Sequence, residues 1–182
     1  MPTPPDEATL VARAQCGDRA SLDALLQSIQ PSLLRYVSGV IGRDAAADIV
    51  QDALITVVRK LAWLSQPHLF RAWSFRIASR LAFRHLRKER RWVRHETDAA
   101  VLEQIAAPEP VDADLLQDLL DRSNLLSEAS RAVFVLHFQE GLTLAEVAAA
   151  LEIPLGTVKS RLAYGLTLLR KHLAPKLEGS DG

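Results

Sequence analysis

The sequence predicts an all-α protein in which two small helical domains are joined by a flexible linker. Aromatic residues make up only 5% of the 182 residues, while Ala and Leu are abundant, which favours helices over sheets. Apolar residues recur at helical spacing through most of the chain, and no convincing strand pattern interrupts them. The stretch 93–112 is acidic, contains two prolines and shows no sustained period apart from a possible short helix at 98–105, which is typical of a linker.

Residues 6–92 are expected to form the first domain as a succession of helices. Residues that cap, start or end a helix mark the boundaries, because Asp favours a helix N-cap, Pro favours a first turn and Gly favours a helix end. These boundary residues are Gly17, Asp18, Pro31, Gly42 and Asp44. A loop at 64–68 then leads into a long basic helix, in which Trp73, Ile77 and Leu81 are predicted to form the apolar stripe that packs on the preceding helix.

Residues 113–174 are expected to form the second domain, with Pro175 stopping its last helix and residues 175–182 forming a tail. Its first clear helix is capped by Ser127 and ends at Gly141. The following stretch, "TLAEVAAALEIPLGTVKSRLAYGL", is typical of a helix-turn-helix: a capping Thr, a short helix with two small alanines, the turn "EIP" and a second amphipathic helix. The residues predicted to face inward are Val147, Leu151, Ile153, Val158, Leu162 and Leu166.

The outer surface of this second helix carries residue types that suit DNA. A recognition helix needs short hydroxyls and long cations to reach base edges and phosphates in the major groove. An ordinary helical hairpin is the alternative, but the cap, the small pair, the short turn and "GTVKSR" occur together in order, which favours DNA binding. Glu152 occupies a turn position that often holds Gly; it is accommodated if the backbone is not left-handed and otherwise costs about 1 kcal/mol. The residues predicted on or near the outer surface are Thr157, Lys159, Ser160, Arg161, Ala163 and Tyr164.

Positive charge is concentrated in residues 71–94. The chain is formally neutral, with 22 basic and 22 acidic residues, whereas this segment holds nine Arg or Lys and a single acid, Glu89. Charge alone fits nucleic acid, a membrane surface or an acidic protein. The narrow apolar face argues against membrane insertion, and a polyanion would relieve the repulsion between like charges spaced four residues apart, so nucleic acid is favoured. The cations that share one helix face are Arg76, Arg80, Arg84, Arg87, Lys88 and Arg91.

The loop before this helix carries Trp63 and Phe70 at its ends. Such a loop could stack on or receive an unpaired base. Aromatic residues at loop ends are more often hydrophobic staples, and the residues alone leave both interpretations open.

Three motifs occur in a fixed order: "DIVQDAL" at 48–54, "RAWSFRIA" at 71–78 and "GTVKSRL" at 156–162. In this order and spacing they resemble motifs of bacterial RNA polymerase sigma factors. The chain length resembles the minimal extracytoplasmic-function (ECF) group, which keeps only the domains called region 2 and region 4. The resemblance implies an alternative sigma factor that directs promoter-specific initiation of transcription, with the first predicted domain as region 2 and the second as region 4.

The resemblance also implies three binding surfaces. Core RNA polymerase would dock through its β′ clamp on Asp48, Gln51, Asp52, Leu54 and Val58. The −10 promoter element would be melted and read, with one base flipped into the loop, by Trp63, Phe70, Trp73 and the six cations of the basic helix. The −35 element would be read by Thr157, Lys159, Ser160, Arg161 and Tyr164. The acidic linker would thread through the polymerase, and a cognate anti-sigma factor would hold the protein inactive.

Two departures from the family pattern bear on which promoter is read. Arg80 and Arg84 stand where the family usually has Asn and Asp, which adds positive charge to the −10 helix. Ala163 and Tyr164 replace a stretch that is commonly rich in Arg, so fewer phosphate contacts are available in the −35 helix.

Several other classes of function are not expected. No nucleophile–base set or phosphate-cradling glycine loop indicates an enzyme, no histidine pair indicates a metal site, and no cofactor is predicted. Cys16, the only cysteine, is expected to be inert. Without a membrane-spanning run or a signal peptide, the protein is expected in the cytoplasm. The alternatives are a stand-alone helix-turn-helix regulator that does not bind core polymerase, and a helical adaptor for acidic proteins.

Overall fold

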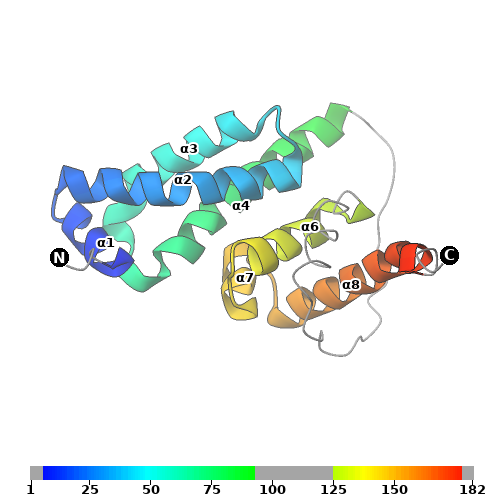
Figure 1. The fold of residues 1–182 in the computed structure, drawn as a ribbon. Coiled ribbons are helices and arrows are strands. Elements are labelled where there is room, and N and C mark those ends of the chain that lie inside the picture. Colours follow the sequence, from blue (N-terminus) through cyan, green and yellow to red (C-terminus); the bar gives the residue numbers. More distant parts are fainter. Residues whose placement is uncertain (1–5, 93–124, 178–182) are drawn as a thin grey trace. The chain divides into compact units, whose positions relative to one another are not determined.

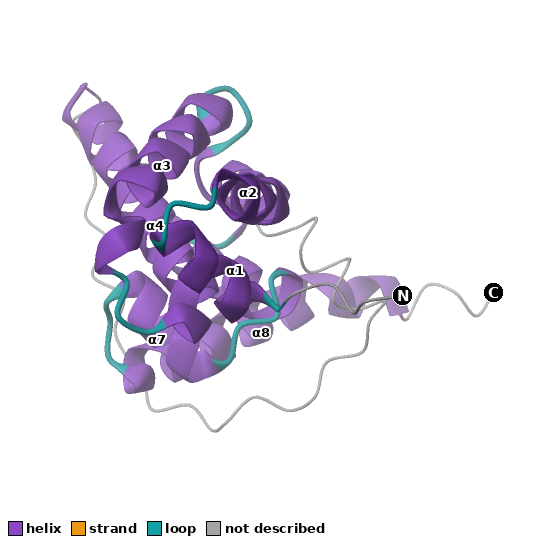
Figure 2. Ribbon diagram, turned by 90° about the vertical axis from the view of Figure 1, so that its left-hand side faces the viewer, coloured by secondary structure: helices purple, strands orange, loops and turns teal. Residues whose placement is uncertain are grey.

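The computed structural model describes residues 6–92 and 125–177, and every regular element in these two parts is helical (Figures 1 and 2). Contacts divide the helices into two compact units, one centred on α1–α4 and the other on α6–α8. The predicted all-α class with two helical domains is therefore confirmed. The predicted linker at 93–112, with its possible short helix, lies outside the described residues, so the domain limits stay predictions.

The first unit is a bundle in which α2 packs against α1, α3 and α4, and α3 packs against α4. Its N-terminal boundaries follow the capping rules, because the carboxylate of Asp18 accepts a hydrogen bond from the N–H of Ala20 at 3.1 Å, and Gly42 ends its helix with φ of 90°. The elements are α1 (Glu7–Gln15), α2 (Arg19–Ile41), α3 (Ala46–Lys60), the 3₁₀ turns η1 (Leu61–Trp63) and η2 (Pro67–Leu69), and α4 (Phe70–Trp92).

Helix α2 is continuous through Pro31, which was predicted to begin a separate helix. A proline inside a helix removes one backbone hydrogen bond and crowds the preceding turn, at a cost of about 3 kcal/mol. The exposed Pro31 is nevertheless tolerated because Ile29, Leu33 and Tyr36 on either side of it are all fully buried on one face. Burying three large apolar side chains offsets that cost, since each is worth roughly 1.5–3 kcal/mol.

Helix α3 begins without the predicted Asp44 cap. Ala45 is the N-cap residue, and no side chain accepts a hydrogen bond from the first turn. The acidic residue of that turn is Asp48, whose negative charge is favourable near the positive end of a helix. The prediction failed because the tight turn after Gly42 places Asp44 one residue before the cap.

The core of the first unit contains a buried polar link between α2 and α4. The hydroxyl of Tyr36 lies 2.6 Å from Oγ of Ser79, which itself donates to the carbonyl of Phe75 at 2.7 Å. Because a serine has one proton to donate, Tyr36 is the donor to Ser79. The rings of Tyr36 and Phe75 also meet edge to face, with centroids 5.5 Å apart. Burial raises the pKa of Tyr36, and the bond to Ser79 opposes that shift.

This link sets the rotation of α4 about its axis. The buried face of α4 runs through Phe75, Ala78 and Ala82, all fully inaccessible to solvent. Of the apolar stripe predicted at Trp73, Ile77 and Leu81, only Ile77 is buried, and the other two are half-buried. The prediction was wrong for Trp73 and Leu81 because the core side of this helix is formed by Phe75, Ile77 and small residues that pack closely.

The second unit contains α6 (Glu128–Phe134), a π-helical turn η4 (Val135–Gln139), α7 (Leu144–Leu151) and α8 (Leu155–Leu177). The predicted caps are present: Oγ of Ser127 accepts from the N–H of Ser130 at 3.3 Å, and Thr143 forms a capping box with Glu146. Gly141, with φ of 69°, follows the π turn. Helix α8 extends two residues beyond Pro175, which was predicted to stop it.

The turn between α7 and α8 adopts a left-handed conformation at Glu152, with φ of 55°. Glu152 is the only residue other than glycine with positive φ in the parts of the chain that the structure describes. An L side chain in this region costs roughly 1–2 kcal/mol. Of the two backbone conformations considered from the sequence for Glu152, the structure shows the left-handed, strained one. Ile153, which follows it, is half-buried rather than fully buried as predicted.

Helices α6 and α8 approach so closely that Gly165 has no room for a side chain. A Cβ atom added to Gly165 would lie 2.5 Å from Cε2 of Phe134, whose ring is fully buried. The neighbouring Ala163 is also buried, at 4% exposure, although it was predicted on or near the outer surface. The small residues of α8 are thus packing residues of the second unit.

We expect Gly165→Ala to lower the free energy of unfolding of the second unit by about 1–3 kcal/mol, because the added methyl group must displace the Phe134 ring. Native-state hydrogen exchange of α6–α8 amides measures this unit by itself. The matched control is Gly156→Ala, where an added Cβ meets nothing within 4 Å. Equal stability of the two variants would contradict the close approach.

We expect Glu152→Gly to raise the free energy of unfolding of the second unit by up to about 1 kcal/mol, because glycine adopts positive φ without strain. Glu152→Asn should fall between the two, since Asn tolerates this conformation better than Glu. The control is Glu128→Gly in the first turn of α6, which should be destabilising by roughly 1 kcal/mol. The same exchange measurement applies, and a loss of stability in Glu152→Gly would rule out the strain.

Candidate functional site

The five residues predicted to bind core polymerase lie along the outer side of α3. Asp48, Gln51 and Asp52 are exposed, Leu54 is half-buried and Val58 is 43% exposed. The opposite side of α3 holds the core residues Val50, Ala53 and Val57. The structure therefore brings carboxylates and apolar side chains together on one surface, a combination suited to a basic and apolar partner.

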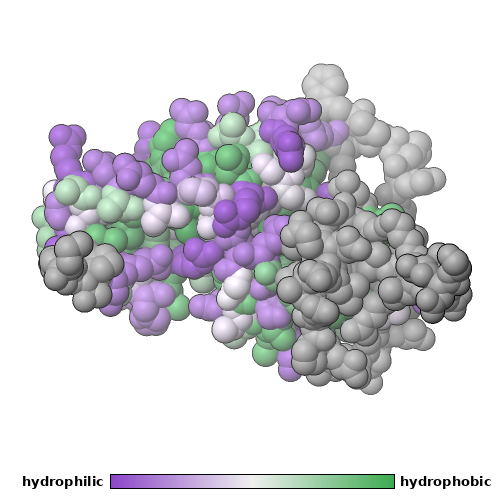
Figure 3. All heavy atoms as spheres, viewed as in Figure 1, coloured by the Kyte–Doolittle hydropathy of each residue, from purple (hydrophilic) through white to green (hydrophobic). Residues whose placement is uncertain are grey.

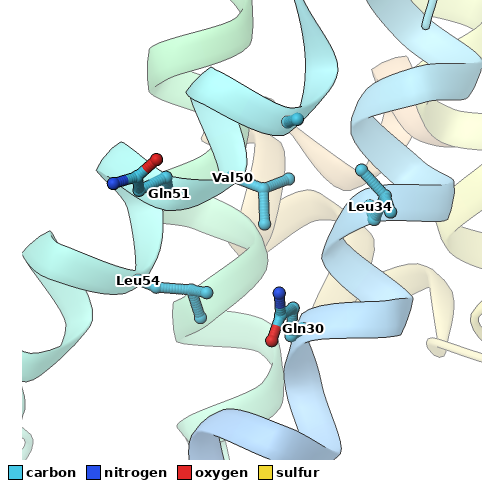
Figure 4. A pocket seen from close by; sticks show the side chains of 6 residues that line it. Gln30, Leu34, Val50, Gln51 and Leu54 are labelled. Atoms are coloured by element: carbon cyan, nitrogen blue, oxygen red, sulfur yellow. The ribbon is translucent and has the colours of Figure 1, made fainter.

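An apolar groove lies beside this surface, between α2 and α3 (Figure 4). It is open to solvent, has a volume of about 310 Å³, and includes Leu34, which is 42% exposed. Apolar side chains also reach the surface along the α2–α3 boundary in Figure 3. The lining residues are Gln30, Leu34, Ala47, Val50, Gln51 and Leu54.

Sequence reasoning found the α3 side of this groove but missed the α2 side, Gln30 and Leu34. A signal was present, because Leu34 falls outside the buried stripe that contains Leu33 and Val37. Leu34 is thus an apolar residue on the polar side of an amphipathic helix, which is a weak signal because single exposed leucines are common. Ile55, 41% exposed on α3, was missed in the same way.

The segment between α3 and α4 separates the two aromatic residues that were predicted to contact a base. Trp63, in η1, is 77% exposed, the highest exposure among the large hydrophobic side chains in the described part of the chain. Phe70 is fully buried at the start of α4, with its ring centroid 6.3 Å from that of Trp73. The assignment of Phe70 to base contact was wrong: it is the core anchor of the segment.

The predicted cations occupy the side of α4 that faces away from its core. Arg76 is half-buried; Arg80, Arg84, Arg87 and Lys88 are exposed. The side chain of Arg91 lies outside what the structure describes. Viewed down the helix axis at 3.6 residues per turn, Trp73 points in a direction between those of Arg80 and Arg84. Its half-buried side chain therefore lies on the same side of α4 as the cations. The only acid of the segment, Glu89, lies 3.3 Å from Nε2 of His85.

Helix α8 presents a smaller polar surface at its N-terminal half. Lys159 is exposed and Tyr164 is 52% exposed, whereas Thr157, Ser160 and Arg161 are half-buried. The hydroxyl of Ser160 donates to the carbonyl of Thr157 at 3.1 Å, and burial lowers the pKa of Arg161. The inward residues Val147, Val158, Leu162 and Leu166 are buried as predicted, while Leu151 is only half-buried.

Two further properties concern the described residues alone. Within residues 6–92 and 125–177, no three His, Cys, Asp or Glu side chains gather as metal ligands. None of the described helices combines the length and apolarity needed to cross a membrane.

Comparison with known proteins identifies the family. Residues 25–92 match the family described as Sigma-70 region 2, and residues 124–171 match Sigma-70, region 4. The ECF RNA polymerase sigma-E factor of Escherichia coli (strain K12) is 29% identical over 168 residues, covering 86% of this chain and 88% of the relative. The sigma-E factor of Haemophilus influenzae is 24% identical over 181 residues, covering 93% and 96%.

Two solved structures share the fold. One is the sigma factor RpoE in complex with the anti-sigma factor NepR from Bartonella quintana, with 26% identity, a TM-score of 0.65, and coverage of 84% of this chain and 96% of that chain. The other, CnrH in complex with the cytosolic domain of CnrY, has 23% identity, a TM-score of 0.64, and coverage of 93% and 97%, and shows the fold alone. The three motifs, the two helical units and these likenesses together show that the chain belongs to the ECF sigma factors, regulatory proteins of transcription initiation.

Proposed function

We propose that this protein is a dissociable specificity subunit that recruits core RNA polymerase to promoters. The observation that carries the proposal is the outer side of α3, where Asp48, Gln51 and Asp52 are exposed beside the apolar groove shared with α2. If this surface contacted only solvent, there would be no reason for Leu34 of α2 and Val58 of α3 to be exposed near the carboxylates. Such a surface suits the β′ clamp, which the family resemblance assigns to these residues.

The same proposal assigns promoter contacts to α4 and α8. The outward cations of α4, with Trp63 on the preceding turn, suit a single-stranded −10 element, because cations attract the backbone and an exposed indole stacks on bases. The outward part of α8, with Lys159 and Tyr164, suits the −35 duplex. Neither surface carries a catalytic role.

We further propose that an anti-sigma factor controls the protein in the cytoplasm. Support comes from the relative RpoE, whose structure contains the anti-sigma factor NepR. The exposed apolar side chains around the α2–α3 groove are those that a competitor of polymerase would cover. The exposed apolar residues of this region are Leu34, Ile55 and Val58.

We expect Asp48→Lys with Asp52→Lys to abolish co-elution with bacterial core RNA polymerase on size exclusion, because two charge reversals place like charges against a basic partner. The double variant should keep its helical circular dichroism, since both side chains are exposed. Asp23→Lys, also exposed but on α2, is the matched control and should still co-elute. Unchanged co-elution of the double variant would remove the clamp assignment and favour a stand-alone regulator.

We expect Lys159→Ala to weaken binding of the full chain to mixed-sequence duplex DNA and to reduce the slope of log affinity against log salt by about one. Lys159→Ala with Arg161→Ala should weaken it further while leaving polymerase binding unchanged. Arg19→Ala, which removes one exposed cation from α2, is the control. If both Lys159→Ala and Arg19→Ala leave the slope unchanged, the assignment of α8 to duplex DNA is wrong.

A further inference from the structure

Helix α1 precedes the region that matches the sigma-70 family, and it ends in a residue with two long-range hydrogen bonds. Nε2 of Gln15 donates to the carbonyl of Leu61 at 2.9 Å and to the carbonyl of Leu64 at 2.8 Å. Gln15 is half-buried, so both bonds are partly shielded from water. A single side-chain amide thus joins α1 to a turn more than forty residues away along the chain.

The two carbonyls bracket the turn that carries Trp63. Leu61 begins η1, and Leu64 follows directly after Trp63. The turn is closed by its own backbone bond, from the N–H of Leu64 to the carbonyl of Leu61 at 3.0 Å. Gln15 adds an external support at the same two residues, both of which are buried. Trp63 lies between them and is 77% exposed, on a turn whose two ends both accept hydrogen bonds from Gln15.

Helix α1 also contacts the far end of the same segment. It packs against both η1 and η2 and against α4. Glu7, in its first turn, lies against the start of α4: burial raises the pKa of Glu7, while the charge and the backbone N–H of Arg71 lower it. Helix α1 therefore spans the whole connection between α3 and α4, from Leu61 to Arg71.

We propose that Gln15 is a positioning residue that holds η1 so that Trp63 is presented to an unpaired DNA base. This inference rests on the proposed −10 function of the segment. A base stacks on an indole with less loss of conformational entropy if the turn beneath the indole is already ordered. Removing the two donors would leave two carbonyls without their side-chain partner and loosen the turn, without touching any atom that contacts DNA.

The test compares Gln15→Met, which keeps the length of the side chain but removes both donors, with Gln27→Met on the exposed side of α2. Each full-length variant is titrated with a fluorescein-labelled, random-sequence single-stranded DNA pool and with a duplex pool of equal length. Trp63→Ala is the reference for loss of stacking. Hydrogen exchange of the amides at 61–70 measures the order of the turn.

We expect Gln15→Met to weaken single-stranded binding about tenfold, as Trp63→Ala does, and to speed exchange at 61–70, while duplex binding and Gln27→Met stay at the wild-type level. If Trp63→Ala weakens single-stranded binding and Gln15→Met does not, the positioning role is overturned and the −10 function stands. If Trp63→Ala has no effect, the −10 function itself fails, and the inference fails with it. Loss of both single-stranded and duplex binding in Gln15→Met would show a general folding defect and overturn the specific role.

Discussion

The hydrogen bond between Tyr36 and Ser79 is the interaction on which the arrangement of the first unit depends. A phenol hydroxyl in a dry core requires a partner, and leaving it unpaired would cost roughly 1–3 kcal/mol. Ser79 meets that need only if the side of α4 that carries Phe75 and Ser79 faces α2. With the rotation of α4 fixed in this way, its cations and Trp73 point away from the core. The binding surface of α4 is thus a consequence of a buried polar bond, and not only of where arginines occur in the sequence.

In helix α3, too, the residues that pack in the core and the residues proposed to bind a partner lie on opposite sides. Its buried side is formed by Val50, Ala53 and Val57, which hold it against α2 and α4. Its outer side keeps Ile55 and Val58 beside acidic residues, although leaving these apolar side chains about two-fifths exposed contributes nothing to folding. The N-terminal half of α3 therefore carries carboxylates on its outer side, whereas the outer side of α4 carries cations. A basic protein partner and a polyanion can thus bind to separate surfaces of one protein.

Much of this could be predicted from the sequence, since helical period, capping residues and composition are local properties. Asp18, Ser127 and Thr143 cap helices as predicted because a cap needs only its own first turn. The predicted Asp44 cap failed because of the local turn after Gly42, whereas the failures at Pro31 and Phe70 involve tertiary packing. Pro31 stays inside a helix because residues on both sides of it are buried, and Phe70 serves the core because α4 begins there.

The rotation of α4 was missed for a related reason: Trp73 and Leu81 were taken as part of the core face, whereas that face combines Phe75 and Ile77 with buried alanines and serines. The period of apolar residues identifies a helix, but it does not show whether the core face is the one with the largest side chains or the one with small residues that let another helix approach closely. The role of Gln15 is the feature least predictable from the sequence. Nothing in its neighbourhood along the chain distinguishes it from Gln27 or Gln30, because its two acceptors come from a turn that only the folded chain brings near.

The departure of α8 from the Arg-rich family pattern has a packing explanation at Ala163, though not at the exposed Tyr164. Ala163 is buried and Gly165 lies against the Phe134 ring, so neither position has space for a long cationic side chain. Arg161, half-buried, has its pKa lowered by that burial. Arg161 keeps its charge but is partly shielded from solvent, so Lys159 is the exposed cation of the N-terminal half of α8, with Tyr164 beside it. If α8 reads the −35 element, its affinity must rest less on phosphate neutralisation than in Arg-rich relatives, and more on the direct contacts of a few side chains. Close helix packing and weak electrostatic attraction are then two results of the same small residues.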